Sequence, residues 1–580
     1  MAAADDFQIP RMAAGCHESV PTGRVPENHK EEYPMKKTLA LLLTALMMLS
    51  VLPMAMAEEA AAAWEPFAEN VSITIPVYDR GQAGVPNVED NYWTHWIQEN
   101  FGDKYNVTVN YVAIPRSDVL TKYAMLAAGD ELPTVLMEYD YPKVTQWAGD
   151  GYMTTFNMDD FAAVAPTYYN RMVENNQLTY TQINGETYFV AALRPYYDTS
   201  YTFQNFYRKD WLEAVGYDHY PVDRAEYVDA LTKIQEAGIA AHPAGGVMIT
   251  GVGSDQNYQY RTWPLDEKEW AMYGDYNTPA LGWEPNYKLL KFENFKYNAG
   301  LTNPEYYLTG TEDEKTNFIN GETFAYGGYI SASMDWLTAF YEANPDAKLG
   351  IVPVSSTIDE EAGTNPGYRT DNPFGMMVGF SKDATEDQLK AAWMYMEWLT
   401  QPENLFTFQW GIEGETFNYN ENGLPVSVSD YNGDYKMGFS NNKDYWCITI
   451  EARQAGTIED MITNNMPHDL PEDFTADVIA WYYDKVAVRD AGWAIDNAKF
   501  SVTMEAEAEY QQTLVELYKE FRDKLTMCSE EEFDDLYAQY AQEYLDAGWQ
   551  EIIDERAKVY EEGFSTHLLN QTAEEVDLSK

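Results

Sequence analysis

Residues 71–78 read VSITIPVY, and the turn Asp79-Arg80-Gly81 follows them directly. β-Branched side chains alternate along this run, which predicts a strand that ends at the turn. We expect a helix over residues 91–101 and a second strand over residues 107–112. A strand, a helix and a further strand in this order form a βαβ unit. The start of the globular region therefore predicts an α/β fold with a mostly parallel sheet.

The alternation of strands and helices continues along the chain. Further strands are expected at residues 134–137, 323–326, 349–353 and 376–380, and helices at residues 117–128, 210–215, 224–237, 312–319 and 387–399. The tail from Glu505 to Tyr560 differs, because its apolar residues recur only at helical spacing. Leu514, Tyr518, Phe521 and Leu525 form one such stripe. The fold class is therefore expected to be α/β with an α-helical C-terminal region.

Residues 35–57 have the pattern of an export signal. Two lysines follow Met35, an apolar run extends from Leu39 to Leu49, and Ala55-Met56-Ala57 provides a small-x-small cleavage site. A membrane anchor is the alternative, but the run is shorter than the roughly 20 apolar residues that a bilayer requires. Residues 1–34 are interpreted as a disordered extension upstream of the true start at Met35. Both segments are excluded from the fold prediction.

Composition limits the classes of partner. The chain has 580 residues, a net charge of −56 and 15% aromatic residues, and the part after the signal is long enough for two or three domains. Such an acidic excess argues against nucleic acid, because phosphate binding depends on lysine and arginine. Cys447 and Cys528 follow the signal, and the sequence leaves open whether they form a disulfide. Two cysteines do not make a disulfide framework that would define the fold. Position 58 is Glu, so no lipid-bearing cysteine follows the predicted cut.

Motifs of known catalytic and metal chemistry are absent from the sequence. There is no HExxH, CxxC, phosphate-binding glycine loop, GxSxG or calcium loop, and the histidines after the signal are far apart. Acidic pairs are so common in this chain that they do not identify an acid–base couple. We therefore predict no catalytic residue, no metal ligand and no cofactor.

Aromatic residues near strand ends are the most informative chemistry in the sequence. Tyr78-Asp79-Arg80 follows one predicted strand and Glu138-Tyr139-Asp140 follows another. In open α/β sheets ligands bind beyond the carboxyl ends of the strands. Flat rings beside carboxylates suit a sugar, whose C–H face stacks while its hydroxyls need directional partners. Most other aromatic residues are expected to be core, including Trp393 on a helical stripe.

Six segments occur in the order of one known family. They are Ala128–Val135, Asn184–Tyr188, Phe206–Leu212 (FYRKDWL), Phe318–Ala325 (FINGETFA), Phe374–Lys382 followed by Ala391–Leu399, and Gly411–Phe417 (GIEGETF). On these segments the chain resembles the extracellular solute-binding proteins of ABC importers. Within that family it is similar to the maltose-binding-like, carbohydrate-binding class and its long lipoprotein-type relatives.

The resemblance implies a two-lobed periplasmic-binding-protein fold of class II type. Residues 58–204 and 366–412 would form one lobe, and residues 205–365 and 413–575 the other. A carbohydrate, expected to be an oligosaccharide, would be captured in the cleft between the lobes and delivered to the transmembrane subunits of an ABC permease. The protein would be exported, as a monomer, to the periplasm, cell surface or exterior, without a lipid anchor.

The resemblance also implies a set of ligand-binding residues. They are Tyr78, Asp79, Arg80, Glu138, Tyr139, Asp140, Tyr201, Tyr329, Trp410 and Glu413. Tyr139, Tyr329 and Trp410 are expected to stack on the ligand. Asp79, Asp140 and Glu413 would accept hydrogen bonds from hydroxyls, and Arg80 would donate them.

Two other functions remain open. A secreted glycoside hydrolase would share the aromatic residues and the acids, but it needs two carboxylates roughly 5–10 Å apart across the scissile bond. Nothing in the sequence selects such a pair. A peptide or metabolite binder on the same two-lobed frame is the other alternative.

Overall fold

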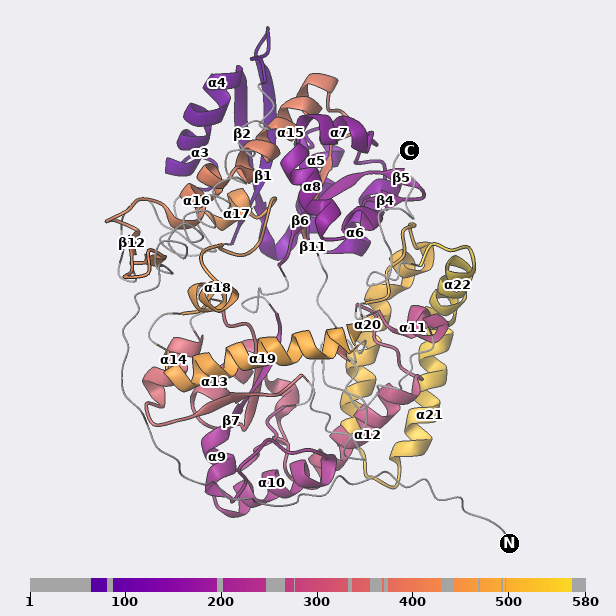
Figure 1. Cartoon of the computed structure of the whole chain (residues 1–580). Helices are drawn as coiled ribbons and strands as arrows, with labels where there is room; N and C mark the ends of the chain where they lie inside the picture. Colours follow the sequence, from indigo (N-terminus) through magenta and orange to yellow (C-terminus); the bar gives the residue numbers. More distant parts are fainter. Residues whose placement is uncertain are drawn as a thin grey trace, which may run out of the picture. The chain divides into compact units, whose positions relative to one another are not determined.

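A computed structural model describes most of residues 64–565 (Figure 1). The internal gaps in that description are residues 81–86, 196–201, 247–266, 276, 332–335, 355–367, 370–373, 429–430, 432, 434–441, 468–469, 492–493 and 496. The predicted extension, the predicted export signal and Tyr201 lie outside the described residues.

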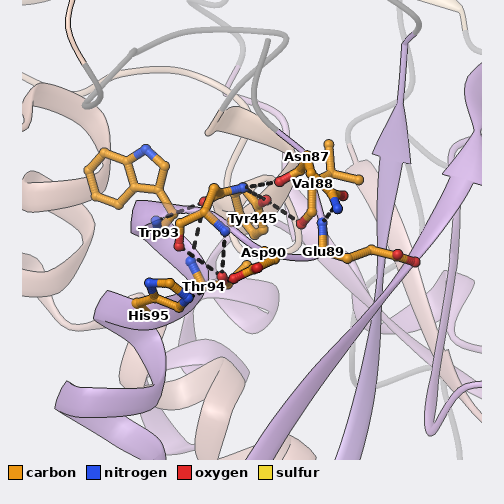
Figure 2. Close-up of polar contacts among 9 residues, drawn as sticks. Asn87, Val88, Glu89, Asp90, Trp93, Thr94, His95 and Tyr445 are labelled. Carbon is orange, nitrogen blue, oxygen red and sulfur yellow. Dashed lines mark hydrogen bonds and ion pairs between the residues drawn. The ribbon is translucent and has the colours of Figure 1, made fainter.

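The first βαβ unit forms as predicted. Strand β1 (Val71–Asp79) pairs in parallel with β2 (Val107–Pro115), in a register that joins Val71 to Val107 and Asp79 to Pro115. Helix α3 (Tyr92–Ile97) lies between them in sequence. It begins at Asn91 because the Asn91 side chain accepts from the backbone N–H groups of Trp93 and Thr94, an N-terminal cap. Figure 2 shows this start of the helix around Thr94.

The next sheet corrects the expectation of mostly parallel pairing. Strand β11 (Phe374–Phe380) lies between β3 (Val135–Glu138) and β6 (Phe189–Leu193) and is antiparallel to both. All seven residues of β11 are buried, so the strand is the centre of this core. Between β6 and β11 the chain contributes three strands to another sheet, and it enters this sheet again from the opposite end.

Another three-stranded sheet is also antiparallel. Strand β7 (Gln204–Arg208) lies between β8 (Ala325–Gly328) and β9 (Leu349–Ile351). Its Phe206 is fully buried against α13 (Thr311–Ile319), α14 (Trp336–Ala343) and α19 (Glu472–Asp490). The helices predicted at residues 210–215, 224–237 and 312–319 and the strands predicted at residues 323–326 and 349–353 are observed within one or two residues, but the strands are antiparallel and β7 was not predicted.

The remaining helices and short strands complete the described fold. The helices are α4 (Asp103–Tyr105), α5 (Val119–Ala128), α6 (Tyr141–Gly149), α7 (Met158–Val164), α8 (Pro166–Glu174), α9 (Lys209–Ala214), α10 (Arg224–Glu236), α11 (Glu267–Tyr273), α12 (Glu284–Asn298), α15 (Glu386–Thr400), α16 (Pro402–Trp410), α17 (Lys443–Trp446) and α18 (Ile458–Asn465). The strands are β4 (Gln182–Ile183), β5 (Glu186–Thr187), β10 (Tyr368–Arg369), β12 (Phe417–Tyr419), β13 (Pro425–Ser427) and β14 (Ala494–Ile495).

The C-terminal region is helical, as predicted. Helices α20 (Glu505–Met527), α21 (Phe533–Tyr544) and α22 (Gln550–Glu561) pack together and against α12 (Figure 1). The predicted stripe from Leu514 to Leu525 is buried in their shared core. Among the helices that the structure describes, none has both the length and the apolar character needed to span a membrane.

Two late segments of the chain join the first core. Residues Tyr445 to Ile450 are buried with β1, β6 and β11, and Leu193 N–H donates to the carbonyl of Thr449 at 3.0 Å. Ser501 accepts a hydrogen bond from the backbone of Asn184 at 2.7 Å. The lobe boundaries given above stay a prediction. This packing favours assigning residues 442–452 to the first lobe instead of the second.

The Asn184-Gly185 hairpin yields a stability prediction. Both residues join β4 to β5 with positive φ, 53° and 80°. An added Cβ at Gly185 meets no atom within 4 Å, so the cost of Gly185→Ala comes from the left-handed backbone alone. We expect a loss of about 1 kcal/mol in the free energy of unfolding, measured in urea. Gly129→Ala, where φ is −91° and the nearest atom lies at 3.5 Å, should cost nothing.

Glu314 on α13 yields a pH prediction. Burial raises the pKa of Glu314 to about 7, although Arg522 acts in the opposite direction. Between the ordinary value of 4.5 and about 7 the folded state binds more protons than the unfolded state, so stability should fall as pH rises through this window. Because Glu314 is partly exposed, we expect the loss to be about 1–2 kcal/mol.

A pair of glutamine variants checks this origin of the pH dependence. Glu314→Gln should reduce the fall in the free energy of unfolding between pH 5 and pH 8, measured by urea denaturation at each pH. Glu342→Gln, at an exposed position of α14, should keep it. An unchanged slope in Glu314→Gln would contradict the assignment.

Candidate functional site

The carboxyl ends of β1, β2 and β3 bring two tyrosines and an arginine together. The rings of Tyr78 and Tyr139 stack, with centroids 6.2 Å apart and planes 30° apart. Tyr78 lies near the end of β1, and Tyr139 directly follows β3. The strand-end rule that was applied to the sequence therefore brings these two predicted residues into contact.

Arg116 completes this strand-end cluster. Its guanidinium carbon lies 5.0 Å from the ring centre of Tyr78 and 5.8 Å from that of Tyr139. Among the described residues Arg116 makes no ion pair and donates no hydrogen bond, and its side chain is half-buried. Its planar donors thus remain available to a bound molecule. The sequence prediction missed Arg116, although it directly follows β2, so the same strand-end rule identifies it.

Arg80 forms an ion pair with Asp444 of the same chain. It donates to both carboxylate oxygens of Asp444 at 2.9 Å, and Asp444 is buried. Burial acts against the charge, but the hydrogen bonds and attraction of Asp444 raise the pKa of Arg80 above its usual value. The expected donor role of Arg80 toward a ligand therefore competes with this ion pair.

Helix α17 holds Asp444 in place. The hydroxyl of Tyr445 donates to the carbonyl of Val88 at 2.6 Å and accepts from the side chain of Asn91 at 2.7 Å (Figure 2). This anchors residues 443–446 beside the start of α3. Asp444 was also missed, because it lies 364 residues from Arg80 and no local pattern marks such a pair.

Glu138 and Tyr78 have buried polar atoms that indicate a polar ligand. Glu138 Oε1 accepts from the backbone N–H groups of Tyr139 at 2.7 Å and Asp140 at 3.3 Å. Glu138 Oε2 and the hydroxyl of Tyr78 have no partner among the described residues, although both residues are 1% exposed. Burial, and then the nearby charge of Glu138, raise the pKa of Tyr78 well above its ordinary value. Orphaned groups of this kind each cost about 1–3 kcal/mol.

A second ion pair and a thiol lie near Tyr139. Arg194 donates to Glu451 at 2.5 Å, and Glu451 is buried. Burial, and then Cys447 and Glu451, raise the pKa of Tyr139, so this ring stays neutral at physiological pH. Cys447 and Cys528 are both free thiols. Arg194, Glu451 and Cys447 were not predicted as site residues.

Asp79 and Asp140 remain near the cluster. Asp79 is exposed at the end of β1. Asp140 begins α6, where its carboxylate accepts from the backbone of Lys143 at 3.4 Å and pairs with the Lys143 amine at 3.3 Å. The carboxylate of Asp140 is 24% exposed, so it keeps accepting capacity for a ligand.

The other predicted residues have different surroundings. Trp410 packs against Phe406 and Phe417 and is 1% exposed, so its ring offers no free face for stacking in this structure. Tyr329 is 40% exposed, with its ring edge-on to Phe203. Glu413 is exposed.

The described side chains offer stacking surfaces, an arginine fork and carboxylate acceptors. Within the part of the chain that the structure describes, no three His, Cys, Asp or Glu residues are grouped as metal ligands. The acids closest to the cluster, Glu138, Asp444 and Glu451, are each bonded to backbone or arginine donors. The arrangement can recognise a ring that carries several hydroxyls, with its flat face on a tyrosine and its hydroxyls on the guanidinium and the carboxylates.

Comparison with known proteins gives one family match. The family described as "Bacterial extracellular solute-binding protein" matches residues 96–411, which is more than half of the chain. No curated protein matches the chain.

Several solved structures have a similar fold. A human-milk-oligosaccharide (HMO)-binding, ABC-transporter-associated protein of Bifidobacterium longum infantis is similar at 12% identity and a TM-score of 0.56, over 85% of this chain and 99% of the other. The alginate-binding protein AlgQ2 is similar at 13% identity and a TM-score of 0.54, over 86% of this chain and 99% of the other. The ABC-transporter substrate-binding protein FusA of S. pneumoniae, in complex with kestose, is similar at 12% identity and a TM-score of 0.53, over 85% of this chain and 99% of the other. These similarities show a shared two-lobed solute-binding fold, with this chain covering nearly the whole of each relative.

Proposed function

Because the chain belongs to the bacterial extracellular solute-binding proteins, as the match over residues 96–411 shows, we propose that it captures an oligosaccharide for an ABC importer. The ligand would bind between two lobes, remain chemically unchanged, and be presented to the transmembrane subunits of the permease. Closure would be driven only by the extra contacts that the ligand makes in the closed state.

The observation that supports a sugar is the strand-end cluster. Tyr139 is partly exposed and stacked on Tyr78, and Arg116 lies over both rings without an ion-pair partner among the described residues. A pyranose or furanose offers a C–H face for the ring and hydroxyls for the guanidinium and for Glu138. A peptide could also pair its carboxylate with Arg116, so the ligand screen described below includes peptides.

The similar structures favour the same class of ligand. Their titles name a milk-oligosaccharide binder, an alginate binder, a protein in complex with kestose and an N-glycan transport protein. At 12–13% identity these names support the class of ligand and do not identify the sugar.

The proposal extends to export and assembly. We propose that residues 35–57 direct export and are removed, that the mature protein is free of a lipid anchor and monomeric, and that it does not bind nucleic acid. The net charge of −56 supports the last point, because phosphate contacts require an excess of Lys and Arg.

A ligand screen with product analysis tests this function. The purified protein is heated with neutral oligosaccharides, peptides and amino acids, and the melting temperature is recorded, since a ligand that binds only the folded state raises it. We expect a rise with an oligosaccharide that chromatography recovers intact. Cleaved sugar would support a glycoside hydrolase instead, and a rise with peptides alone would overturn the sugar assignment.

A further inference from the structure

A cavity of about 400 Å³ lies between α6 and α20, next to the strand-end cluster. Asp140 and Lys143 line it on the α6 side, and Glu507 and Ala508 on the α20 side. Asp140 of the cavity wall directly follows Tyr139 of the cluster in the chain, which connects the two sites. The volume is in the range of small-molecule sites.

The charged groups around the cavity already have partners. Asp140 pairs with Lys143 at 3.3 Å. Asp275 and Glu507 both pair with Arg556, at 2.9 and 2.5 Å, and Arg556 is fully buried behind them. Lys499, the other cation on the wall, is 5% exposed and makes interactions of its own.

The wall therefore carries no surplus positive charge. Three carboxylates, those of Asp140, Asp275 and Glu507, face the two amines of Lys143 and Lys499, with Arg556 behind. The chain as a whole carries −56. An anionic group would lose its hydration in this cavity without gaining an unpaired cation.

The rest of the wall suits a hydroxylated ring. Phe500, Val502 and Met504 supply apolar surface on one side. The uncharged amide of Gln512 supplies both donors and an acceptor. The Gln511 amide already donates to Thr278 at 2.9 Å, and the Thr503 hydroxyl donates to the carbonyl of Thr145 at 3.2 Å, so these two groups offer their oxygen atoms as acceptors. An apolar face with neutral polar groups is the complement of an uncharged sugar unit.

We propose that this cavity is a second subsite for the same ligand, one that takes an uncharged sugar unit and disfavours an acidic one. This inference rests on the proposed function, because the first unit of the ligand would bind at the strand-end cluster. Binding would then strengthen as the oligosaccharide becomes long enough to occupy both positions.

Plugging the cavity tests the inference. Ala508 lines the cavity and is exposed, so Ala508→Trp fills its mouth without altering the core. Gln512→Trp is a second plug on the same helix, and Glu509→Trp, also exposed but not on the wall, is the matched control. Isothermal titration uses the full-length mature protein with maltose-, fructan- and chitin-derived series of increasing length, and oligogalacturonates of the same lengths.

The expected results are specific to length and charge. Wild type and Glu509→Trp should gain affinity with the number of neutral units. Both plugged variants should lose about tenfold or more of that gain, while they keep the affinity for the shortest member. Because Arg116 at the first site can pair with a carboxylate, the readout for charge is the gain with length: oligogalacturonates should gain less affinity per added unit in wild type than neutral sugars do.

Two kinds of failure are distinguishable. If the plugged variants bind every length as wild type does, or if oligogalacturonates gain as much affinity with length as neutral sugars do, the second subsite is wrong and the proposed function stands. If wild type binds no sugar at all, the proposed function fails and this inference fails with it.

Discussion

Replacing Arg556 with methionine is expected to lower the free energy of unfolding by about 3–5 kcal/mol, the largest stability effect that we predict for a single side chain. Methionine keeps the length and apolar contacts of the arginine stem but leaves the buried carboxylates of Glu507 and Asp275 without their cation. Each must then become protonated or draw in water, and either costs free energy.

The geometry around Arg556 explains the size of this effect. The guanidinium is fully buried, donates to Glu507 at 2.6 Å and to Asp275 at 2.9 Å, and also donates to the carbonyl of Met272 at 2.9 Å. Its carbon lies 5.4 Å from the ring centre of Trp549. The attraction of both carboxylates outweighs burial and raises the pKa of Arg556, so the residue stays charged. One side chain thus ties α22 to α20 and to the segment after α11.

Urea denaturation of Arg556→Met and of a surface control measures the effect. Lys268→Met breaks the ion pair between Lys268 and Glu561, which also joins α11 to α22 but is exposed on both sides. It should cost less than about 1 kcal/mol. A loss of similar size in both variants would contradict the role assigned to the buried network.

Local sequence patterns predicted the elements but not the pairing of distant ones. The Asn184-Gly185 turn and the stripe from Leu514 to Leu525 depend on neighbours within a few residues, and both were found as expected. The direction of β11 depends instead on the route of the chain between residues 193 and 374. No periodicity within β11 itself contains that information.

The same distinction applies to the candidate site. Tyr78 and Tyr139 were predicted because strand ends can be read from the sequence, and Arg116 was missed although the same rule identifies it. Asp444 could not be predicted, since its partner Arg80 lies 364 residues away. Trp410 was expected to stack on a ligand, but residue type alone does not distinguish a core ring from an exposed one.

Removing the guanidinium of Arg116 is expected to weaken binding of the captured oligosaccharide by about 10- to 100-fold, because hydrogen bonds to charged groups contribute about 1.5–3 kcal/mol each. The change is Arg116→Met, which keeps an apolar stem over Tyr78 and Tyr139. Among the described residues Arg116 makes no ion pair, so the melting temperature of the ligand-free protein should stay the same.

Two further variants separate ligand contact from structural support. Arg80→Met should lose stability as well as affinity, because it leaves the buried Asp444 without its bidentate partner. Arg116→Lys keeps the charge but not the planar fork and should recover only part of the affinity. Isothermal titration with the sugar found in the screen, alongside thermal melts, measures both quantities. Unchanged affinity in Arg116→Met would remove Arg116 from the site, and the sugar would then have to be held by groups other than the cluster at the ends of β1, β2 and β3.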